Sequence, residues 1–283
     1  MEIKKILREN KVFPLKRLGQ NFLIEKKMIS KIIETAELSK NDIVLEIGPG
    51  TGNLTLELAK RAKKVLAIEK DLRMIEILKK MLENEKVANV KIIKGDVRKI
   101  PLHKLATTAC LLCNGYKVVA NLPFYLTGPV IRKFLEKVEV KPQKMVLIVQ
   151  KEVAQRICAK PPKMNLLAVS VQFYAQPKIT SYLPKEFFWP QPKVDGAIIK
   201  IVPRQPFSQF SARFREKFFK IVKAGFSHPR KQIINNLTLF LRRNKIEVKE
   251  WLLKSGVKPE DRAGNLTFEI WLKLTKNLIF LQK

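Results

Sequence analysis

A glycine-rich loop constrains this sequence more than any other feature. The apolar run Ile43–Ile47 leads directly into Gly48, Gly50 and Gly52, and a helical pattern over residues 51–62 follows. Glycine lets the backbone turn sharply and lets a ligand approach without a Cβ atom in the way. A strand, a glycine loop and a helix in this order are typical of a cofactor site at one edge of a parallel sheet.

Strands and helices continue to alternate after this loop. We expect helices at residues 28–36, 72–82 and 128–136, and strands at residues 65–69, 90–94, 117–120 and 145–150. Two further strands, residues 179–183 and 197–202, lack a full helix between them and suit a hairpin-like pair at the sheet edge. The sequence therefore predicts an α/β fold with a Rossmann-like, mostly parallel, seven-stranded sheet covered by helices on both faces.

The glycine spacing and the acidic residues around it indicate the cofactor. A dinucleotide site needs G-x-G-x-x-G, but Asn53 stands where its third glycine would be, so the motif is G-x-G-x-G. Glu46, just before the loop, would repel a pyrophosphate and attract a cationic amino-acid head group. Glu69 ends the next strand and suits the two ribose hydroxyls, and Asp96, after the third strand, suits an adenine amino group. Together they predict S-adenosylmethionine as the cofactor, and hence a methyltransferase.

A second motif, Asn121-Leu122-Pro123-Phe124, ends the fourth strand at the same sheet edge. Asn and Pro also favour ordinary turns, so position is what gives the motif its weight. An Asn oxygen and a backbone carbonyl accept the two N–H bonds of an adenine amino group, which turns its lone pair toward the methyl donor. Pro123 stiffens the loop and Phe124 offers a face for a flipped-out base. The motif predicts methyl transfer to adenine, without a strong general base.

Composition indicates the kind of partner. The formal charge of +31 attracts polyanions, so nucleic acid is the expected partner, although a Lys-rich surface can also serve solubility alone. Cys110 and Cys113 form a lone CxxC without the further ligands of a zinc site, and no metal is expected. No stretch approaches the length of a membrane span, so we expect a cytoplasmic protein with no membrane partner.

The sequence pattern changes at Pro203 and becomes purely helical and basic. We predict a cofactor-binding domain at residues 1–203 and a small all-helical, RNA-binding domain at residues 204–283. Residues 1–20 are expected to form a basic, irregular N-terminal arm.

Taken with Gly19-Gln20-Asn21-Phe22-Leu23, these motifs make the chain resemble the ribosomal RNA adenine dimethyltransferases, specifically the small-subunit (KsgA) type. Residues 150–156 and 188–195 also match, and the resemblance covers nearly the whole chain. It implies transfer of two methyl groups to each of two adjacent adenosines in the 3′-terminal hairpin loop of small-subunit rRNA, within a pre-30S particle. We expect the enzyme to be a monomer.

The resemblance also assigns roles. The residues that match Asn21 and Leu23 help to close the cofactor pocket, those that match Gly48, Glu69 and Asp96 bind the cofactor, and the match of Asn121 lies where cofactor and target base meet. The expected cofactor site therefore comprises Asn21, Leu23, Glu46, Gly48, Gly50, Gly52, Glu69, Asp96 and Asn121, and the expected catalytic residues are Asn121, Leu122, Pro123 and Phe124. Many family members have Tyr where this chain has Phe124, which removes a hydroxyl and keeps the ring.

Three other interpretations share parts of this pattern. One is a large-subunit (23S) rRNA adenine methyltransferase of the antibiotic-resistance type, which has the same core motifs. Another is a non-enzymatic RNA-binding factor for ribosome assembly or transcription. The third is a DNA adenine methyltransferase, which the absence of a separate target-recognition domain disfavours.

Overall fold

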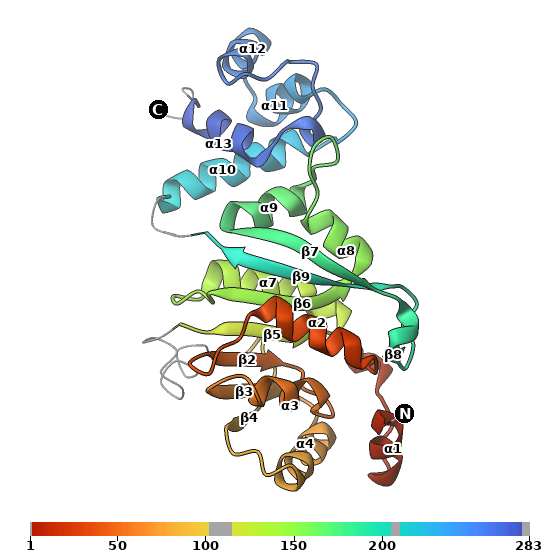
Figure 1. The fold of residues 1–283 in the computed structure, drawn as a ribbon. Coiled ribbons are helices and arrows are strands. Elements are labelled where there is room, and N and C mark those ends of the chain that lie inside the picture. Colours follow the sequence, from red (N-terminus) through yellow and green to blue (C-terminus); the bar gives the residue numbers. More distant parts are fainter. Residues whose placement is uncertain (1, 102–114, 205–209, 279–283) are drawn as a thin grey trace. The chain divides into compact units, whose positions relative to one another are not determined.

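The computed structural model describes residues 2–101, 115–204 and 210–278, so Cys110 and Cys113 lie outside the described part (Figure 1). Internal contacts divide the chain into two units. The first, here called the sheet unit, comprises Met1–Ala154 and Pro177–Pro203, and the second, the helical unit, comprises Gln155–Gln176 and Arg204–Lys283. None of the helices in the described ranges is long and apolar enough to cross a bilayer.

The sheet unit contains the expected seven-stranded sheet, with the strand order β4-β3-β2-β5-β6-β9-β7. The strands are β2 (Ile43–Ile47), β3 (Lys64–Glu69), β4 (Val90–Lys94), β5 (Lys117–Asn121), β6 (Lys144–Gln150), β7 (Ala175–Leu183) and β9 (Gly196–Pro203). The first five pair in parallel, and β9 runs antiparallel to β6. The Rossmann-like prediction is confirmed, and β7 and β9 are neighbours at one sheet edge as predicted.

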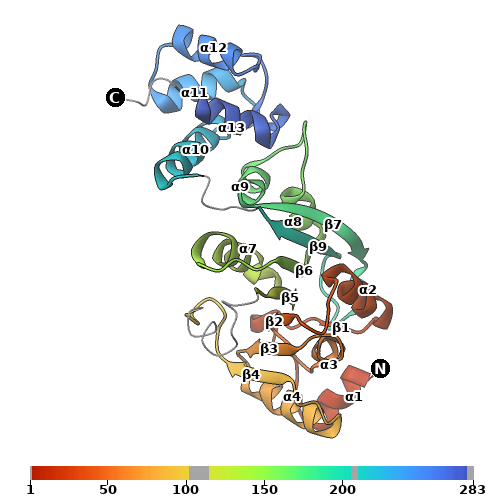
Figure 2. The ribbon, with the colours of Figure 1, turned by 60° about the vertical axis from the view of Figure 1, so that its left-hand side comes forward.

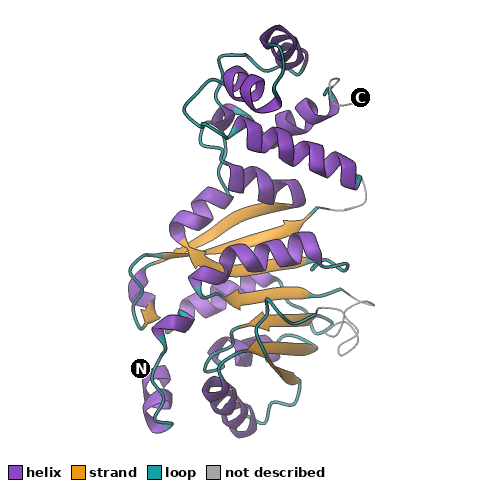
Figure 3. Cartoon of the chain, turned by 180° about the vertical axis from the view of Figure 1, so that it is seen from behind, coloured by secondary structure: helices purple, strands orange, loops and turns teal. Residues whose placement is uncertain are grey.

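Helices cover both faces of the sheet (Figures 1 and 3). They are α2 (Lys26–Ala36), α3 (Asn53–Ala59), α4 (Leu72–Asn84), α7 (Thr127–Arg132), which continues as a π-helical turn over Lys133–Lys137, and α8 (Lys151–Ile157). Helices α2 and α3 bury apolar side chains such as Ile32 and Leu58 against Val44 and Val119 of the sheet. Every residue of β2 is buried, as in parallel strands that have helices on both sides. This packing fixes the strand ends from which the functional loops emerge.

The N-terminal arm is not irregular, and that expectation was wrong. Residues Glu2–Glu9 form α1, followed by a single 3₁₀ turn at Lys16–Leu18 and the short strand β1 (Phe22–Leu23). Ile3 and Leu7, spaced by one helical turn, are buried against Met74 and Ile77 of α4. Figure 2 shows α1 beside α4. A helix this short has only marginal stability on its own in water, and its packing against α4 therefore stabilises it. Strand β1 pairs with β8 (Phe188–Trp189), after the 3₁₀ turn Lys185–Phe187.

The helical unit has its own aromatic core. Its helices are α9 (Leu166–Tyr174), α10 (Ala212–Gly225), α11 (Ile233–Leu241), α12 (Lys245–Lys254) and α13 (Phe268–Lys276), with a 3₁₀ turn at Ala263–Asn265. The ring centroid of Phe173 lies 4.5 Å from that of Phe218. Residues 155–176 therefore group with the helices after Pro203, although the sequence placed them in the first domain. The assignment of cofactor binding and RNA binding to separate domains stays a prediction.

Candidate functional site

The glycine loop after β2 uses its three glycines in two ways. Gly48, Gly50 and Gly52 all have positive φ angles, of 71°, 57° and 93°. A Cβ atom on Gly48 would meet nothing closer than a backbone oxygen at 3.9 Å, so the space beside this residue is open. A Cβ atom on Gly52 would lie 2.7 Å from Leu78, so this glycine allows the loop to pack on α4. Gly48 thus leaves room for a ligand to approach, whereas Gly50 and Gly52 serve close packing, because a Cβ atom on Gly50 would lie 2.8 Å from the Phe22 ring.

A cavity opens at the carboxyl ends of β2, β3 and β5. Its walls combine carboxylates and amides with apolar side chains. The lining residues are Leu18, Gly19, Gln20, Asn21, Phe22, Ile47, Gly48, Gly50, Ile68, Glu69, Lys70, Gly95, Asp96, Val97, Asn121, Pro123, Tyr125 and Leu126. The strand ends and the N-terminal arm therefore share one cavity.

Glu69 is held by backbone donors on both carboxylate oxygens. The amides of Lys70 and Asp71 donate to its Oε1 at 2.7 and 2.8 Å, and the amide of Gly50 donates to Oε2 at 3.3 Å. Burial raises the pKa of Glu69, and the three amides act against that shift. The amides fix the orientation of a carboxylate that has lone pairs left for hydroxyl donors.

Asp96 lies at the same cavity between two cations. Arg98 donates to it through Nε at 3.0 Å and Nη2 at 2.6 Å, and Lys70 donates through Nζ at 3.3 Å. The Arg98 guanidinium holds the pKa of Asp96 far below its usual range. Burial acts in the opposite direction but is the weaker effect. Asp96 is therefore a charged acceptor over the whole range of neutral pH.

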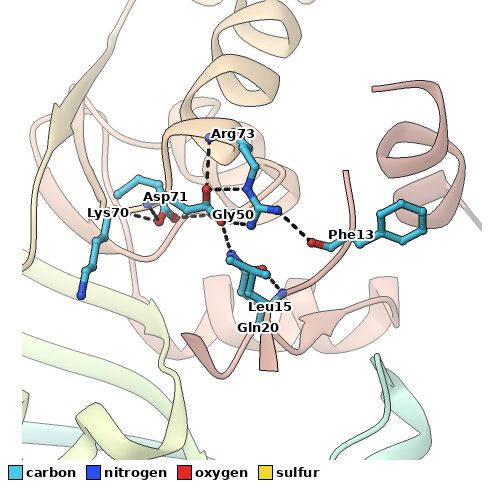
Figure 4. Close-up of polar contacts among 8 residues, drawn as sticks. Phe13, Leu15, Gln20, Gly50, Lys70, Asp71 and Arg73 are labelled. Carbon is cyan, nitrogen blue, oxygen red and sulfur yellow. Dashed lines mark hydrogen bonds and ion pairs between the residues drawn. The ribbon is translucent and has the colours of Figure 1, made fainter. Parts of the chain in front are cut away.

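A chain of polar contacts joins the N-terminal arm to the loop after β3 (Figure 4). Gln20 donates to Oδ2 of Asp71 at 2.8 Å and accepts from the amide of Leu15 at 2.7 Å. Arg73 donates to both oxygens of Asp71 and to the carbonyl of Phe13 at 3.2 Å. Burial opposes the charge of Asp71, but Arg73 and Gln20 hold its pKa below the usual value. We call Gln20, Asp71 and Arg73 the arm latch, because it fixes the arm against the cavity.

Asn121 has a defined orientation. Its Nδ2 atom donates to the carbonyl oxygen of Asn21 at 2.9 Å, so Oδ1 is the amide atom left to accept a hydrogen bond from a ligand. Pro123 lines the cavity next to it, and a Cβ atom on Gly19 would lie only 3.1 Å from Cβ of Pro123. The N-terminal arm and the Asn121–Phe124 motif after β5 therefore meet at the point where Asn121 faces the cavity.

Five of the expected site residues do not line the cavity. Gly52 packs on α4, Leu23 pairs with Phe188 in the β1–β8 ribbon, and Leu122 is buried. The Phe124 side chain is half-buried beside the cavity and is not among its lining residues. Glu46 is 1% exposed, and burial raises the pKa of its carboxyl to about 8, with the Thr55 hydroxyl acting against the shift. A direct contact of Glu46 with a cationic head group stays a prediction.

Comparison with known proteins identifies the family. The ribosomal RNA adenine dimethylase family model matches residues 15–279. The chain belongs to this family. It is therefore an S-adenosylmethionine-dependent rRNA adenine dimethyltransferase. The glycine loop and the Asn121 motif had predicted the cofactor and methyl transfer to adenine, and the family resemblance had implied rRNA as the substrate.

Relatives and solved structures resemble this dimethylase over most of their length. It is 40% identical to the ribosomal RNA small subunit methyltransferase A of Dehalococcoides mccartyi (strain CBDB1), over 92% of this chain and 86% of the relative. For the protein of the same name from Pelotomaculum thermopropionicum (strain DSM 13744 / JCM 10971 / SI), identity is 37% over 98% and 95%. A dimethyladenosine transferase structure from Plasmodium falciparum has a TM-score of 0.73 at 27% identity, covering 89% of this chain and 95% of that one. The 23S rRNA methyltransferase ErmE has a TM-score of 0.74 at 26% identity, covering 91% and 99%.

The dimethylase cavity includes residues that the motifs had not indicated. Gln20 belongs to the Gly19–Leu23 motif but was given no role of its own, and Lys70 flanks Glu69 without any feature that marks it as functional. Tyr125 directly follows the Asn121–Phe124 motif and has a half-exposed ring at the cavity. Its position next to Phe124, as a second aromatic residue, is the feature of the sequence that could have indicated a role for Tyr125.

Proposed function

We propose that this dimethylase acts on small-subunit rRNA and dimethylates two adjacent adenosines in the 3′-terminal hairpin loop of a pre-30S particle, in the cytoplasm and as a monomer. The identity of 37–40% to proteins named as small subunit methyltransferases, over 86–95% of their length, supports this choice of subunit. Identity to the 23S enzyme ErmE is lower, at 26%.

The residues that line the cavity fit S-adenosylmethionine in their donor set and in the apolar surface that they offer. Gly48 leaves open space for a ligand near the backbone, and the fixed carboxylate of Glu69 suits a ribose diol. Asp96 suits the adenine amino group, while Ile68 and Val97 offer apolar surface for the ring. In this proposal Asn21 closes the cavity from the side of the N-terminal arm. The arm latch keeps Asn21 in place because it holds Gln20, the preceding residue. When bound, the cofactor supplies an electrophilic methyl group on a sulfonium.

The orientation of Asn121 is the observation that carries the proposed chemistry. Because its Nδ2 is engaged by Asn21, Oδ1 can accept an N–H of the target amino group. With a main-chain carbonyl as second acceptor, the amino nitrogen becomes pyramidal and its lone pair points at the methyl donor. Pro123 keeps the loop rigid, and Phe124 packs against the target base. A monomethylated amino group still has one N–H for Oδ1, so the same site performs the second transfer.

The test uses small subunits that lack the modification, with mass spectrometry of the rRNA 3′ hairpin after incubation with enzyme and cofactor. We expect dimethyladenosine with the wild-type protein and none with Asn121→Ala, although Asn121→Ala should bind the particle with unchanged affinity. Asn84→Ala, at an exposed site at the end of α4, is the matched control. No methylation of the particle, but methylation of naked 23S rRNA, would instead assign the enzyme to the large subunit.

The helical unit also contributes to the proposed function. It is basic and contains the segment after Pro203 that the sequence assigned to RNA. We propose that it binds rRNA phosphates, which predicts that affinity for the particle falls as salt rises. If Asn121→Ala rescued the cellular defect of a strain lacking the gene, the primary role would be that of a non-enzymatic assembly factor.

A further inference from the structure

Tyr125 and Arg98 lie beside the cavity but outside the motifs that define it. Tyr125 lines the cavity, yet it is 47% exposed, so its ring extends from the cavity into solvent. The guanidinium carbon of Arg98 lies 5.9 Å from the centre of that ring. This distance is at the outer limit of a cation–π contact. We call the two side chains the outer rim.

Several groups hold the outer rim in place. A Cβ atom on Gly19 would lie 3.5 Å from Cε1 of Tyr125, so the N-terminal arm reaches the ring. The Lys133 ammonium donates to the carbonyls of Val97 and Ile100 at 2.6 and 2.7 Å, which fixes the turn that carries Arg98. Groups fixed in this way lose little conformational entropy when they bind a partner.

Arg98 keeps donors on the side away from Asp96. Its Nε and Nη2 atoms donate to that carboxylate, and Nη1 has no hydrogen-bond acceptor within the described residues. Asp96 is also paired with Lys70, so two cations face one carboxylate and the group keeps a net positive charge. A guanidinium edge with this charge suits a phosphate oxygen.

An RNA strand offers partners for both side chains, since aromatic rings stack on any base and arginine pairs with phosphates. The target adenine must reach Oδ1 of Asn121 inside the cavity, which leaves the half-exposed ring for a nucleotide outside it. We propose, resting on the function proposed above, that Tyr125 and Arg98 bind the nucleotide that flanks the target adenosine. Its base stacks on Tyr125 and its phosphate pairs with the Nη1 edge of Arg98. In the proposed substrate, that nucleotide is the second adenosine.

The first test measures binding without methyl transfer. A fluorescently labelled hexanucleotide of adenosines is titrated with the full chain, and anisotropy gives the dissociation constant. Tyr125→Leu should raise it about tenfold, within the range known for base–aromatic stacking, and Tyr125→Phe should restore it. Tyr182→Leu is the matched control and should bind normally. Tyr182 is 49% exposed and lies beside Lys151, with 5.7 Å between the ammonium and the ring centre, but it does not line the cavity.

Two further readouts separate this role from a structural one. Arg98→Leu should reduce the slope of log affinity against log salt by about 0.7, the value for one phosphate contact with a single strand. With unmodified small subunits as substrate, Tyr125→Leu should raise KM for the particle, whereas Tyr182→Leu should leave it unchanged.

The outcomes are distinguishable. Equal effects of Tyr125→Leu and Tyr182→Leu would overturn the subsite, and so would an unchanged salt slope in Arg98→Leu. If the wild-type chain fails to methylate small subunits while Tyr125→Leu still weakens hexanucleotide binding, the proposed function fails and the subsite stands.

Discussion

Glu46 is the residue for which the structure makes the sharpest prediction. Its side chain is 1% exposed, and its Oε2 atom has no hydrogen-bond partner within the described residues. Burial raises the pKa from its ordinary value of 4.5 to about 8, opposed by the Thr55 hydroxyl and assisted by the charge of Glu69. At neutral pH the folded protein therefore keeps this carboxyl protonated, whereas the unfolded chain ionises it. Glu46→Gln replaces the acid with a neutral amide of nearly the same shape.

The sign and size of the effect follow from proton linkage. The folded state binds the extra proton, so the stability that Glu46 contributes is fully present below pH 4.5 and is lost as pH rises through 8. Each pH unit inside that window lowers the free energy of unfolding by about 1.4 kcal/mol. Between pH 5 and 8 the sum is about 3.5 kcal/mol. Glu46→Gln lacks this loss, so its stability relative to wild type should rise by that amount across the window.

The assay is urea unfolding of both proteins at pH 5, 6, 7 and 8, followed by circular dichroism. A buried amide with unpaired donors adds a constant cost, so the change in the difference with pH is the quantity to compare. Glu83→Gln makes the same exchange at an exposed site and serves as control. Parallel pH profiles for wild type and Glu46→Gln would refute the buried, neutral state. Parallel profiles together with weakened cofactor binding would instead support a charged carboxylate that faces the cofactor.

Two other predictions concern the arm and the helical unit. Arg73→Met leaves the buried Asp71 without its cation, so the arm latch should loosen. We expect the dissociation constant for S-adenosylmethionine, measured by equilibrium dialysis, to rise several-fold. Lys79→Met on the same helix is the control and should not change it. Normal cofactor affinity in Arg73→Met would mean that the latch does not hold the arm on the cavity. Gly225→Ala places a Cβ atom 2.3 Å from Cη2 of Trp271 and should cost about 1–3 kcal/mol in thermal unfolding, whereas Gly128→Ala meets nothing within 4 Å and should be neutral or slightly stabilising. Equal melting temperatures for the two alanine variants would contradict this account.

The architecture was predictable from the sequence because its signals are local. Each parallel strand is a short, mostly apolar run, and four of them end at a glycine, an acidic residue or Asn121 that is visible in the sequence. Strand ends on one side of a parallel sheet must meet, so Gly48, Glu69, Asp96 and Asn121 were expected together, and all four line one cavity.

Residues whose role depends on distant partners were harder to predict. Helix α1 was missed because its stability comes from α4, some 70 residues away. Helix α9 groups with the helices after Pro203, although it precedes Pro203 in the sequence, and its Phe173 packs against Phe218. Nothing in the sequence indicates that α1 packs against α4 or that Phe173 packs against Phe218.

The sequence alone determined the class of fold, the cofactor chemistry and the family, since these depend on residue types at fixed short spacings. Only the tertiary structure decided how individual side chains are used. Glu46 and Gly52 belong to the glycine-loop motif, yet one points into the protein interior and the other packs on α4. Gln20 lines the cavity and is held there by Asp71, 51 residues away, and Tyr125 is at the cavity where Phe124 was expected. Side-chain direction is fixed by packing with segments far away in the chain, and local spacing carries no record of that packing.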